Sequence, residues 1–273
     1  MLKMNKFMAP PWLKYPHIPC GSIGWRMGYG ECYMEEFYKW YDSLDESVKG
    51  EYDEKFPKPL SWALLCERLG DFSQLKWRTD GNQKYSASDI GKKDSFVYFW
   101  LHKSSEGKCG EECFSQWYES FFCVGHREYW CAEQYMMSEK ARLFGDKDSF
   151  DMIMSSRDQT QIKALGRNVK GFDEEIWNRF KYLIVLNGNY YKFSSDEKLR
   201  KILLNTGSAV LAEASPYDRV WGIGIDEEKA KKCGCSRWRG ENLLGFALME
   251  VRDELARIWK YENELDFNMI NGA

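Results

Sequence analysis

The chain has little histidine and proline, no excess of positive charge and no long apolar run. It contains 3 His and 7 Pro in 273 residues, and 39 Lys and Arg against 42 Asp and Glu leave a net charge of −3. This charge argues against a protein that binds nucleic acid mainly through phosphate contacts, although a nucleotide-sized or single-base substrate stays open. Because no stretch reaches the ~18 apolar residues of a membrane-spanning helix, we expect no membrane partner.

The cysteine content argues against a secreted fold held by disulfides. The nine cysteines are odd in number, and the first residues, MLKMNKFMAPPWLKYP, lack the apolar core of a signal peptide. We therefore expect a cytoplasmic protein whose thiols act as small apolar residues. The spacings Cys109-x3-Cys113 and Cys233-Gly-Cys235 are not those of zinc pairs, so the sequence predicts no metal site.

Aromatic residues are abundant, and they occur in two regions of different character. The chain has 12 Trp, 16 Phe and 16 Tyr, which supply buried area and can also stack on bases or sugars. Residues 1–90 combine a Gly-rich irregular stretch with helical segments expected at 33–56 and 58–72, and we interpret them as an accessory N-terminal extension. A boundary near SASDIGKKD leaves residues 91–273 as the main domain.

The main domain has the pattern of an α+β fold that is mostly helical with a small β-sheet. Aromatic and β-branched residues predict strands over 95–101 and 209–215, and residues 114–130 predict a loop and hairpin with Gly125 in the turn. Helical periodicity and capping residues predict helices at 132–145, 149–156, 158–167, 173–188, 194–207 and 241–265.

Two charged residues lie on the apolar face of the helix expected at 132–145. At 100° per residue, Glu133 and Lys140 fall on the same face, roughly 10 Å apart along the helix axis. Burying such charges is unfavourable unless they are paired or used, and burial shifts their pKa values in a way that suits acid–base or amine chemistry. The alternatives are a structural ion pair or a Lys140 side chain that extends to solvent.

A second pair of acids follows the strand expected at 209–215, in the stretch AVLAEASPYDRVWGIG. Glu213 lies near the strand end and Asp218 lies in the following turn, where side chains often face a cleft. In the alternative interpretation, Asp218 caps the turn and Glu213 pairs with a nearby arginine. The glycines of WGIG do not form a dinucleotide-binding loop, because Glu227 stands where the third glycine would be.

A set of ordered motifs resembles the NADAR family, also called YbiA-like. The motifs lie within residues 95–260, and the most specific are EAS-x-x-D-x-x-WG-x-G followed by W-x-G-x-N-x-LG. The others are FSQWYESFF, REYWCAEQYMMSEKARLF, IKALGR, FDEEIWNRF and KF. The resemblance implies a YbiA-like fold and glycoside chemistry on ribose, because members of the family are known as N-glycosidases.

The resemblance implies two kinds of substrate, which share a phosphorylated ribose joined to nitrogen at its anomeric carbon. Some family members cleave the ribose–amine bond of early riboflavin-pathway intermediates, and others remove ADP-ribose from modified guanine bases. The expected partners are therefore small phosphorylated ribosyl compounds and ADP-ribosylated nucleic acid bases, and no cofactor is implied. The rivals from other classes are a module that binds ADP-ribose or a related nucleotide without cleaving it, and an interaction protein that works through its aromatic extension.

The family motifs coincide with the residues already singled out. The resemblance implies catalytic roles for Glu133 at the helix start, Lys140 in the KA pair and Asp218 in the turn. It implies substrate binding by the other matched residues, which are Ser115, Arg167, Trp177, Arg179, Glu213, Ser215, Trp221, Gly222 and Asn242. The chain departs from the family where Gln116 replaces the Asn of FSNF and Glu119 replaces a Pro.

N-glycoside cleavage develops positive charge on the ribose as the C–N bond lengthens. A carboxylate can stabilise that charge while an acid protonates the leaving nitrogen, and Asp218 and Glu133 are the candidates. Alternatively, desolvation can lower the pKa of Lys140, so that its amine attacks the anomeric carbon and forms a Schiff base with ring-opened ribose. The two arginines would hold the phosphate, and Trp221 or Trp177 would stack on the base or sugar. The sequence leaves the water and lysine routes open.

Overall fold

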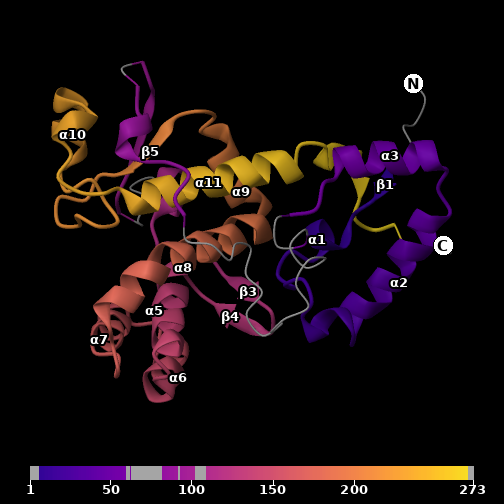
Figure 1. The fold of residues 1–273 in the computed structure, drawn as a ribbon, viewed down its shortest axis with the longest axis horizontal. Coiled ribbons are helices and arrows are strands. Elements are labelled where there is room, and N and C mark those ends of the chain that lie inside the picture. Colours follow the sequence, from indigo (N-terminus) through magenta and orange to yellow (C-terminus); the bar gives the residue numbers. More distant parts are fainter. Residues whose placement is uncertain (1–5, 60–61, 63–81, 92, 102–108, 270–273) are drawn as a thin grey trace. The chain divides into compact units, whose positions relative to one another are not determined.

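The computed structural model describes residues 6–59, 62, 82–91, 93–101 and 109–269. The chain divides into two units, and Figure 1 labels their helices and strands. Unit 1 comprises Met1–Thr79, Cys123–Arg127 and Asp253–Ala273, and unit 2 comprises Asp80–Phe122 and Glu128–Arg252. The helix expected at 58–72 lies almost entirely outside the described residues, and the division of the chain at residue 90 stays a prediction.

Unit 1 is built from short helices whose aromatic residues pack together. Its elements are β1 (Phe7–Met8), α1 (Pro11–Lys14), η1 (Ile23–Trp25), α2 (Tyr29–Asp42), α3 (Glu46–Lys55), η7 (Glu262–Glu264) and β6 (Leu265–Asp266). The hydroxyls of Tyr33 in α2 and Tyr52 in α3 donate hydrogen bonds to the carbonyls of Ala9 and Met8 over 2.7 and 2.9 Å. These buried tyrosines tie both helices to the segment of β1, which pairs in parallel with β6.

Unit 2 holds a two-stranded parallel sheet and a series of helices. Its elements are η4 (Ala87–Asp89), β2 (Phe96–Phe99), η5 (Glu111–Phe114), α5 (Ala132–Leu143), α6 (Lys147–Ser155), α7 (Gln159–Arg167), α8 (Glu174–Ser195), α9 (Glu197–Asn205), β5 (Val210–Glu213), α10 (Glu227–Cys233) and η6 (Cys235–Arg237). The hairpin of β3 (Phe122–Val124) and β4 (Arg127–Tyr129) and the helix α11 (Leu243–Ile258) have residues in both units. In the sheet, Phe96 pairs with Val210 and Phe99 with Glu213, which places Glu213 at the strand end.

Aspartates set the starts of five helices in unit 2. The carboxylate at each N-cap accepts a hydrogen bond from the backbone N–H three residues later, and such a cap contributes ~1 kcal/mol. The capping residues of α6 to α10 are Asp146, Asp158, Asp173, Asp196 and Asp226. These local contacts explain why the helix starts could be read from the sequence more reliably than the helix ends.

The predicted fold class, α+β and mostly helical with a small sheet, is confirmed. The two predicted strands are β2 and β5, and Gly125 turns the hairpin with a φ of 63°.

The predicted stop of α8 at Gly188 is wrong, because the helix continues to Ser195. A Cβ at Gly188 would lie 2.6 Å from the Tyr135 ring, so this glycine permits close helix packing rather than ending the helix. Similarly, α11 ends at Ile258, before the predicted end at residue 265. Within the described part of the chain, no helix is long and apolar enough to cross a membrane.

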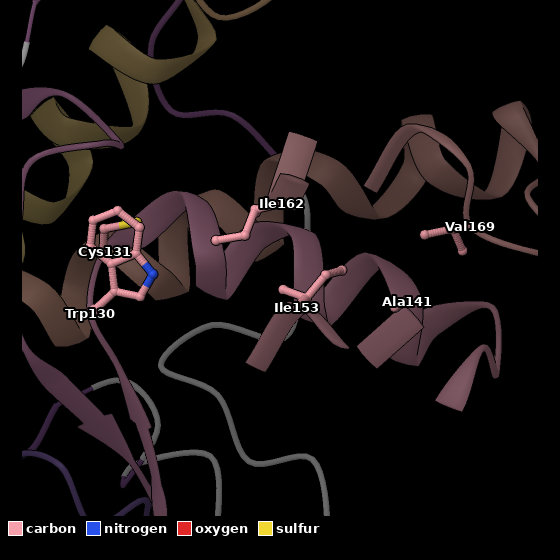
Figure 2. Close-up of a cluster of buried hydrophobic side chains, with 6 residues drawn as sticks. All are labelled: Trp130, Cys131, Ala141, Ile153, Ile162 and Val169. Carbon is pink, nitrogen blue, oxygen red and sulfur yellow. The ribbon is translucent and has the colours of Figure 1, made fainter. Parts of the chain in front are cut away.

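The helix α5 is the centre of the helical layer in unit 2. It packs against α6, α7 and α8 (Figure 1). Figure 2 shows a cluster of buried apolar residues, none of them more than 9% exposed, from α5, α6, α7 and the adjoining segments; it consists of Trp130, Cys131, Ala141, Ile153, Ile162 and Val169. Because α5 packs against three helices, its charged residues Glu133, Glu139 and Lys140 are buried.

The start of α11 lies directly against β5. A Cβ on Gly245 would be only 2.1 Å from the Leu211 carbonyl oxygen. The Asn242 side chain donates to that same carbonyl over 2.9 Å and accepts the Glu213 N–H over 3.1 Å. Asn242 has a φ of 55°, a left-handed conformation that asparagine adopts more readily than most residues. These contacts fix the strand end that carries Glu213.

We predict that Gly245→Ala destabilises unit 2, because the added methyl group forces α11 away from the β5 backbone. Such overpacking costs about 1–3 kcal/mol, so the melting temperature should fall by several degrees. Gly91→Ala is the control, since the atoms nearest to a Cβ there belong to the Asp94 side chain, at ordinary contact distances of 3.6 to 3.8 Å. Calorimetric melting of Gly245→Ala at the wild-type temperature would contradict this packing.

Candidate active site

Glu133 lies in the first turn of α5 and is buried. It is 7% exposed, and its backbone N–H donates to the Gln116 carbonyl over 2.9 Å. Burial raises the pKa of Glu133 to about 7, with a further contribution from the Asp218 carboxylate and opposition from Lys163. Glu133 therefore keeps a proton at higher pH than an exposed glutamate does.

Glu213, at the end of β5, belongs to the same electrostatic group. Its pKa is raised to about 8, mainly by burial and then by Asp218 and Glu133, while Lys163 opposes the rise. The Oε2 atom of Glu213 is buried and has no hydrogen-bond partner among the described residues. Leaving a buried oxygen unpaired costs about 1–3 kcal/mol, a penalty that a donor group of the substrate would relieve.

Asp218 is held firmly by its own turn. Its Oδ1 atom accepts the N–H groups of Val220 and Trp221 over 2.9 and 2.7 Å, and its own N–H donates to the Ser215 hydroxyl over 3.2 Å. Asp218 thus caps the turn, as the alternative interpretation of the sequence expected. The same carboxylate also raises the pKa values of Glu133 and Glu213, so capping does not remove it from the group of acids.

Lys163 was missed by the sequence reasoning, although it lies in the quoted motif IKALGR. It is an exposed residue of α7, and its ammonium lies 5.3 Å from the centre of the Trp117 ring. It is the cation that opposes the raised pKa of both Glu133 and Glu213. Its place one turn before Arg167 on α7 was the available signal, because residues four apart share a helix face.

Lys140 is buried on α5, but its partners are not acids. Its ammonium donates to the Gly166 carbonyl over 2.8 Å and lies 4.2 and 5.2 Å from the ring centres of Phe172 and Trp177. Burial lowers the pKa of Lys140, and no carboxylate among the described residues contributes to that shift. The alternative of a Glu133–Lys140 ion pair is therefore wrong, since the two side chains of α5 use different neighbours.

The expected phosphate and ring contacts lie on α7, α8 and the turn after β5. Arg167 and Arg179 are exposed, and the Arg179 guanidinium lies 5.6 Å from the centre of the Phe180 ring. Trp177 and Trp221 are half-buried. Arg167 directly follows Gly166, whose carbonyl binds the Lys140 ammonium. The backbone of Arg167 therefore lies next to the contact between Lys140 and Trp177.

Four of the residues expected to bind substrate contact main-chain atoms of the protein. They are Ser115, Ser215, Gly222 and Asn242. Both serine hydroxyls accept backbone N–H groups nearby in the chain. A Cβ on Gly222 would lie 2.8 Å from the Glu213 carbonyl oxygen. These residues shape the loops that carry the acids, and a direct contact with substrate stays a prediction.

Gln116 is buried and keeps an unpaired acceptor. Its Nε2 donates to Asn189 Oδ1 over 3.1 Å, and Asn189 Nδ2 donates to the Val185 carbonyl over 2.9 Å. This chain of donors fixes the direction of both amide groups. The Oε1 atom of Gln116 has no partner within the described residues, so it can accept a hydrogen bond from a ligand.

The structure thus groups three carboxyl groups with one ammonium, and we name Glu133, Glu213, Asp218 and Lys163 the acid cluster. Neighbouring carboxyl groups do not all ionise together at neutral pH, so the cluster offers both a proton and a negative charge. Within the described ranges, including the acid cluster, no group of three or more His, Cys, Asp or Glu residues is arranged to hold a metal ion.

The NADAR domain family model matches residues 98–256. The chain belongs to the NADAR family. The N-glycosidase R617 of Acanthamoeba polyphaga mimivirus is 43% identical over 166 residues, which cover 59% of this chain and 96% of that protein. The N-glycosidase Npun_R5314 of Nostoc punctiforme is 31% identical over 133 residues, 48% of this chain and 77% of that protein. The NMR structure of the E. coli protein YbiA aligns with a TM-score of 0.49 and 23% identity, covering 61% of this chain and 88% of that chain.

The family match confirms the resemblance seen in the motifs, and the named relatives support N-glycosidase activity for this NADAR protein. All four residues of the acid cluster lie inside the matched region. The residues before 98 lie outside it, so the family gives no role to the N-terminal third.

We predict that the acid cluster makes unit 2 less stable as the pH rises from about 5 to about 8. The folded pKa values of Glu133 and Glu213, about 7 and about 8, exceed the ~4.3 of an unfolded glutamate, so the folded state binds more protons in this range. This stabilisation is complete below pH ~4.3 and is lost as the pH rises through the folded values. Melting temperature measured against pH should decline less steeply in Glu133→Gln and Glu213→Gln than in the wild type.

The control for this pH series is Glu241→Gln, because Glu241 is exposed. It should keep the wild-type slope of melting temperature against pH. Equal slopes for the wild type and both cluster variants would show that these carboxyl groups titrate like exposed ones.

Proposed function

We propose that this N-glycosidase hydrolyses the bond between C1 of a phosphorylated ribose and a nitrogen atom of a base or amine. The candidate substrates are those that the family resemblance implies, ADP-ribosylated guanine and early riboflavin-pathway ribosylamine phosphates. The acid cluster is the observation that supports this proposal best, since Glu133 and Glu213 hold protons near neutral pH in the field of Asp218. Cleaving an N-glycosidic bond needs an acid and a stabilising negative charge.

We assign the chemical roles from the environment of each carboxyl group. Asp218, whose oxygen is held by two N–H groups, stabilises the positive charge that develops on the ribose. Glu133, with a pKa of about 7, protonates the leaving nitrogen. Glu213, with a pKa of about 8 and an unpaired Oε2, binds the substrate in its protonated form. Lys163 keeps the cluster from carrying an excess of negative charge.

The remaining residues bind the two ends of the substrate. Arg167 and Arg179 are exposed on α7 and α8, and guanidinium groups suit bidentate phosphate binding. Trp177 and Trp221 are half-buried rings that can stack on the base or sugar. The Oε1 atom of Gln116 accepts a hydroxyl or amino donor of the substrate, which relieves its unpaired state.

Lys140 is the proposed nucleophile of the lysine route. Burial lowers its pKa, and its carbonyl and ring contacts leave it without the carboxylate that would keep it charged. Lys163, by contrast, is exposed and interacts with the carboxyl groups of the acid cluster. Lys140 is therefore the lysine whose burial favours the neutral amine that the lysine route needs.

We predict that Glu133→Gln and Asp218→Asn each lower kcat by about 10²-fold or more, because each removes a group that acts on the breaking bond. The assay follows release of the base or amine from ADP-ribosylated guanosine, riboflavin-pathway ribosylamine phosphates and NAD. The exposed variant Glu241→Gln should keep wild-type turnover, and circular dichroism should confirm folding. Tight binding of ADP-ribose by wild-type protein that cleaves none of these substrates would favour the non-catalytic module.

We also predict that Lys140→Met lowers kcat by about 10²-fold or more, because it removes the neutral amine of the lysine route. Borohydride added during turnover should leave a ribosyl adduct on the wild type, detected by mass spectrometry, that Lys140→Met lacks and Lys163→Met retains. An adduct lost only in Lys163→Met would assign the nucleophile to Lys163. A wild type that turns over substrate and forms no adduct would instead favour attack by water.

A further inference from the structure

A buried lysine outside the acid cluster lies near the C-terminal end of α8. Lys192 is 1% exposed, and its ammonium donates to the carbonyls of Cys113 and Ser115 over 2.6 and 2.9 Å. It also lies 5.1 and 5.7 Å from the ring centres of Phe193 and Tyr118. No carboxylate within the described residues forms an ion pair with it. Lys192 is thus a charged group in the interior whose hydrogen bonds go to main-chain carbonyls.

Burying an ammonium group is strongly unfavourable before its hydrogen bonds are counted, so the position of Lys192 calls for an explanation. Burial lowers the pKa of Lys192 to about 8, which shows the same penalty. An apolar side chain could fill the space without it. Unlike an apolar residue, Lys192 forms two charge-assisted hydrogen bonds to the backbone of one segment, residues 113–117.

A second side chain of α8 holds the same segment. Asn189 lies three residues before Lys192, so the two side chains share a helix face. Its Oδ1 atom accepts Gln116 Nε2 over 3.1 Å. Lys192 therefore holds the main chain of segment 113–117, and Asn189 holds a side chain in its middle.

The segment in turn contacts the acid cluster at two points. The Gln116 carbonyl accepts the Glu133 N–H over 2.9 Å at the start of α5. The Trp117 ring lies 5.3 Å from the Lys163 ammonium. A displacement of segment 113–117 would therefore move a neighbour of the proton donor and a neighbour of the cluster cation together.

We propose that Lys192, together with Asn189, is a positioning residue that holds segment 113–117 in place, so that Gln116 meets the substrate next to the acid cluster. The catalytic consequence rests on the proposed function, whereas the anchoring itself does not. Because the Glu133 side chain is carried by α5 while the substrate-binding Gln116 lies in the segment that Lys192 holds, the loss of Lys192 affects KM more than kcat.

The test is Lys192→Met, which keeps a long unbranched side chain and removes both bonds to the carbonyls. Hydrogen exchange followed by mass spectrometry should show the amides of residues 115–120 and of Glu133 exchanging about tenfold faster or more, since each 1.4 kcal/mol of lost anchoring gives a factor of ten. For the best substrate of the panel, KM should rise about tenfold or more while kcat stays within about threefold. A loss that came only from unfolding would lower the active fraction and leave KM unchanged.

Two further variants complete the experiment. Lys198→Met removes an exposed lysine of the neighbouring helix α9 and should match the wild type in exchange, KM and kcat. Asn189→Ala removes the other anchor and should give the exchange and KM signature of Lys192→Met. If Lys192→Met does not fold, Asn189→Ala decides the matter with the same measurements.

The outcomes separate this proposal from the proposed function. Unchanged exchange in residues 115–120 in a folded anchor variant would overturn the anchoring. Faster exchange with wild-type KM and kcat would reduce Lys192 to a purely structural residue and overturn its positioning role. A wild type inactive on every substrate of the panel would overturn the proposed function, while the exchange measurement would still test the anchor.

Discussion

Carboxyl groups that share a poorly solvated space do not all ionise together at neutral pH, and the candidate active site of this NADAR protein depends on that constraint. Glu133 is buried and Glu213 is half-buried with a buried Oε2 atom, and the Asp218 carboxylate adds to the rise in both pKa values, so protons stay on the glutamates up to near-neutral pH. One lysine, Lys163, offsets part of the negative charge. The removal from water is in turn produced by the packing of α5 among three other helices, so the chemistry of the site follows from the core of unit 2.

Each member of the acid cluster is held by contacts that belong to the scaffold. Glu213 is placed by the parallel pairing of β5 with β2 and by the side chain of Asn242 at the start of α11. Asp218 is placed by N–H groups of its own turn. Glu133 is placed by the N-terminal turn of α5 and by the carbonyl of Gln116. The site is therefore assembled from a strand end, a turn and a helix start, which come from separate parts of the chain.

The sequence predicts the elements and residues whose structure depends on local chemistry. It does not predict those whose structure or environment depends on residues distant in the chain. The helical wheel found Glu133 because a charge on an apolar face is unusual, and the turn after β5 drew attention to Glu213 and Asp218. Lys163 lies on an exposed helix face, where a lysine is ordinary, so only the fold reveals its acidic neighbours. Gly188 has the local appearance of a helix end, but the Tyr135 ring packed against it explains why it lies inside α8. The wheel placed Lys140 correctly in the interior and could not show that its partners are a carbonyl and two rings.

The glycines around the turn of Asp218 have a consequence for how this protein can change. A Cβ on Gly240 would lie 2.2 Å from the Gly222 carbonyl oxygen, so the main chains there touch without a side chain between them. Side chains can adopt new rotamers when a neighbour is replaced, whereas a contact between two backbones has no such freedom. The turn therefore holds Glu213 and Asp218 in fixed positions. We therefore expect sequence changes to be tolerated at the exposed side chains of α7 and α8, where added bulk extends into solvent, rather than at these glycines.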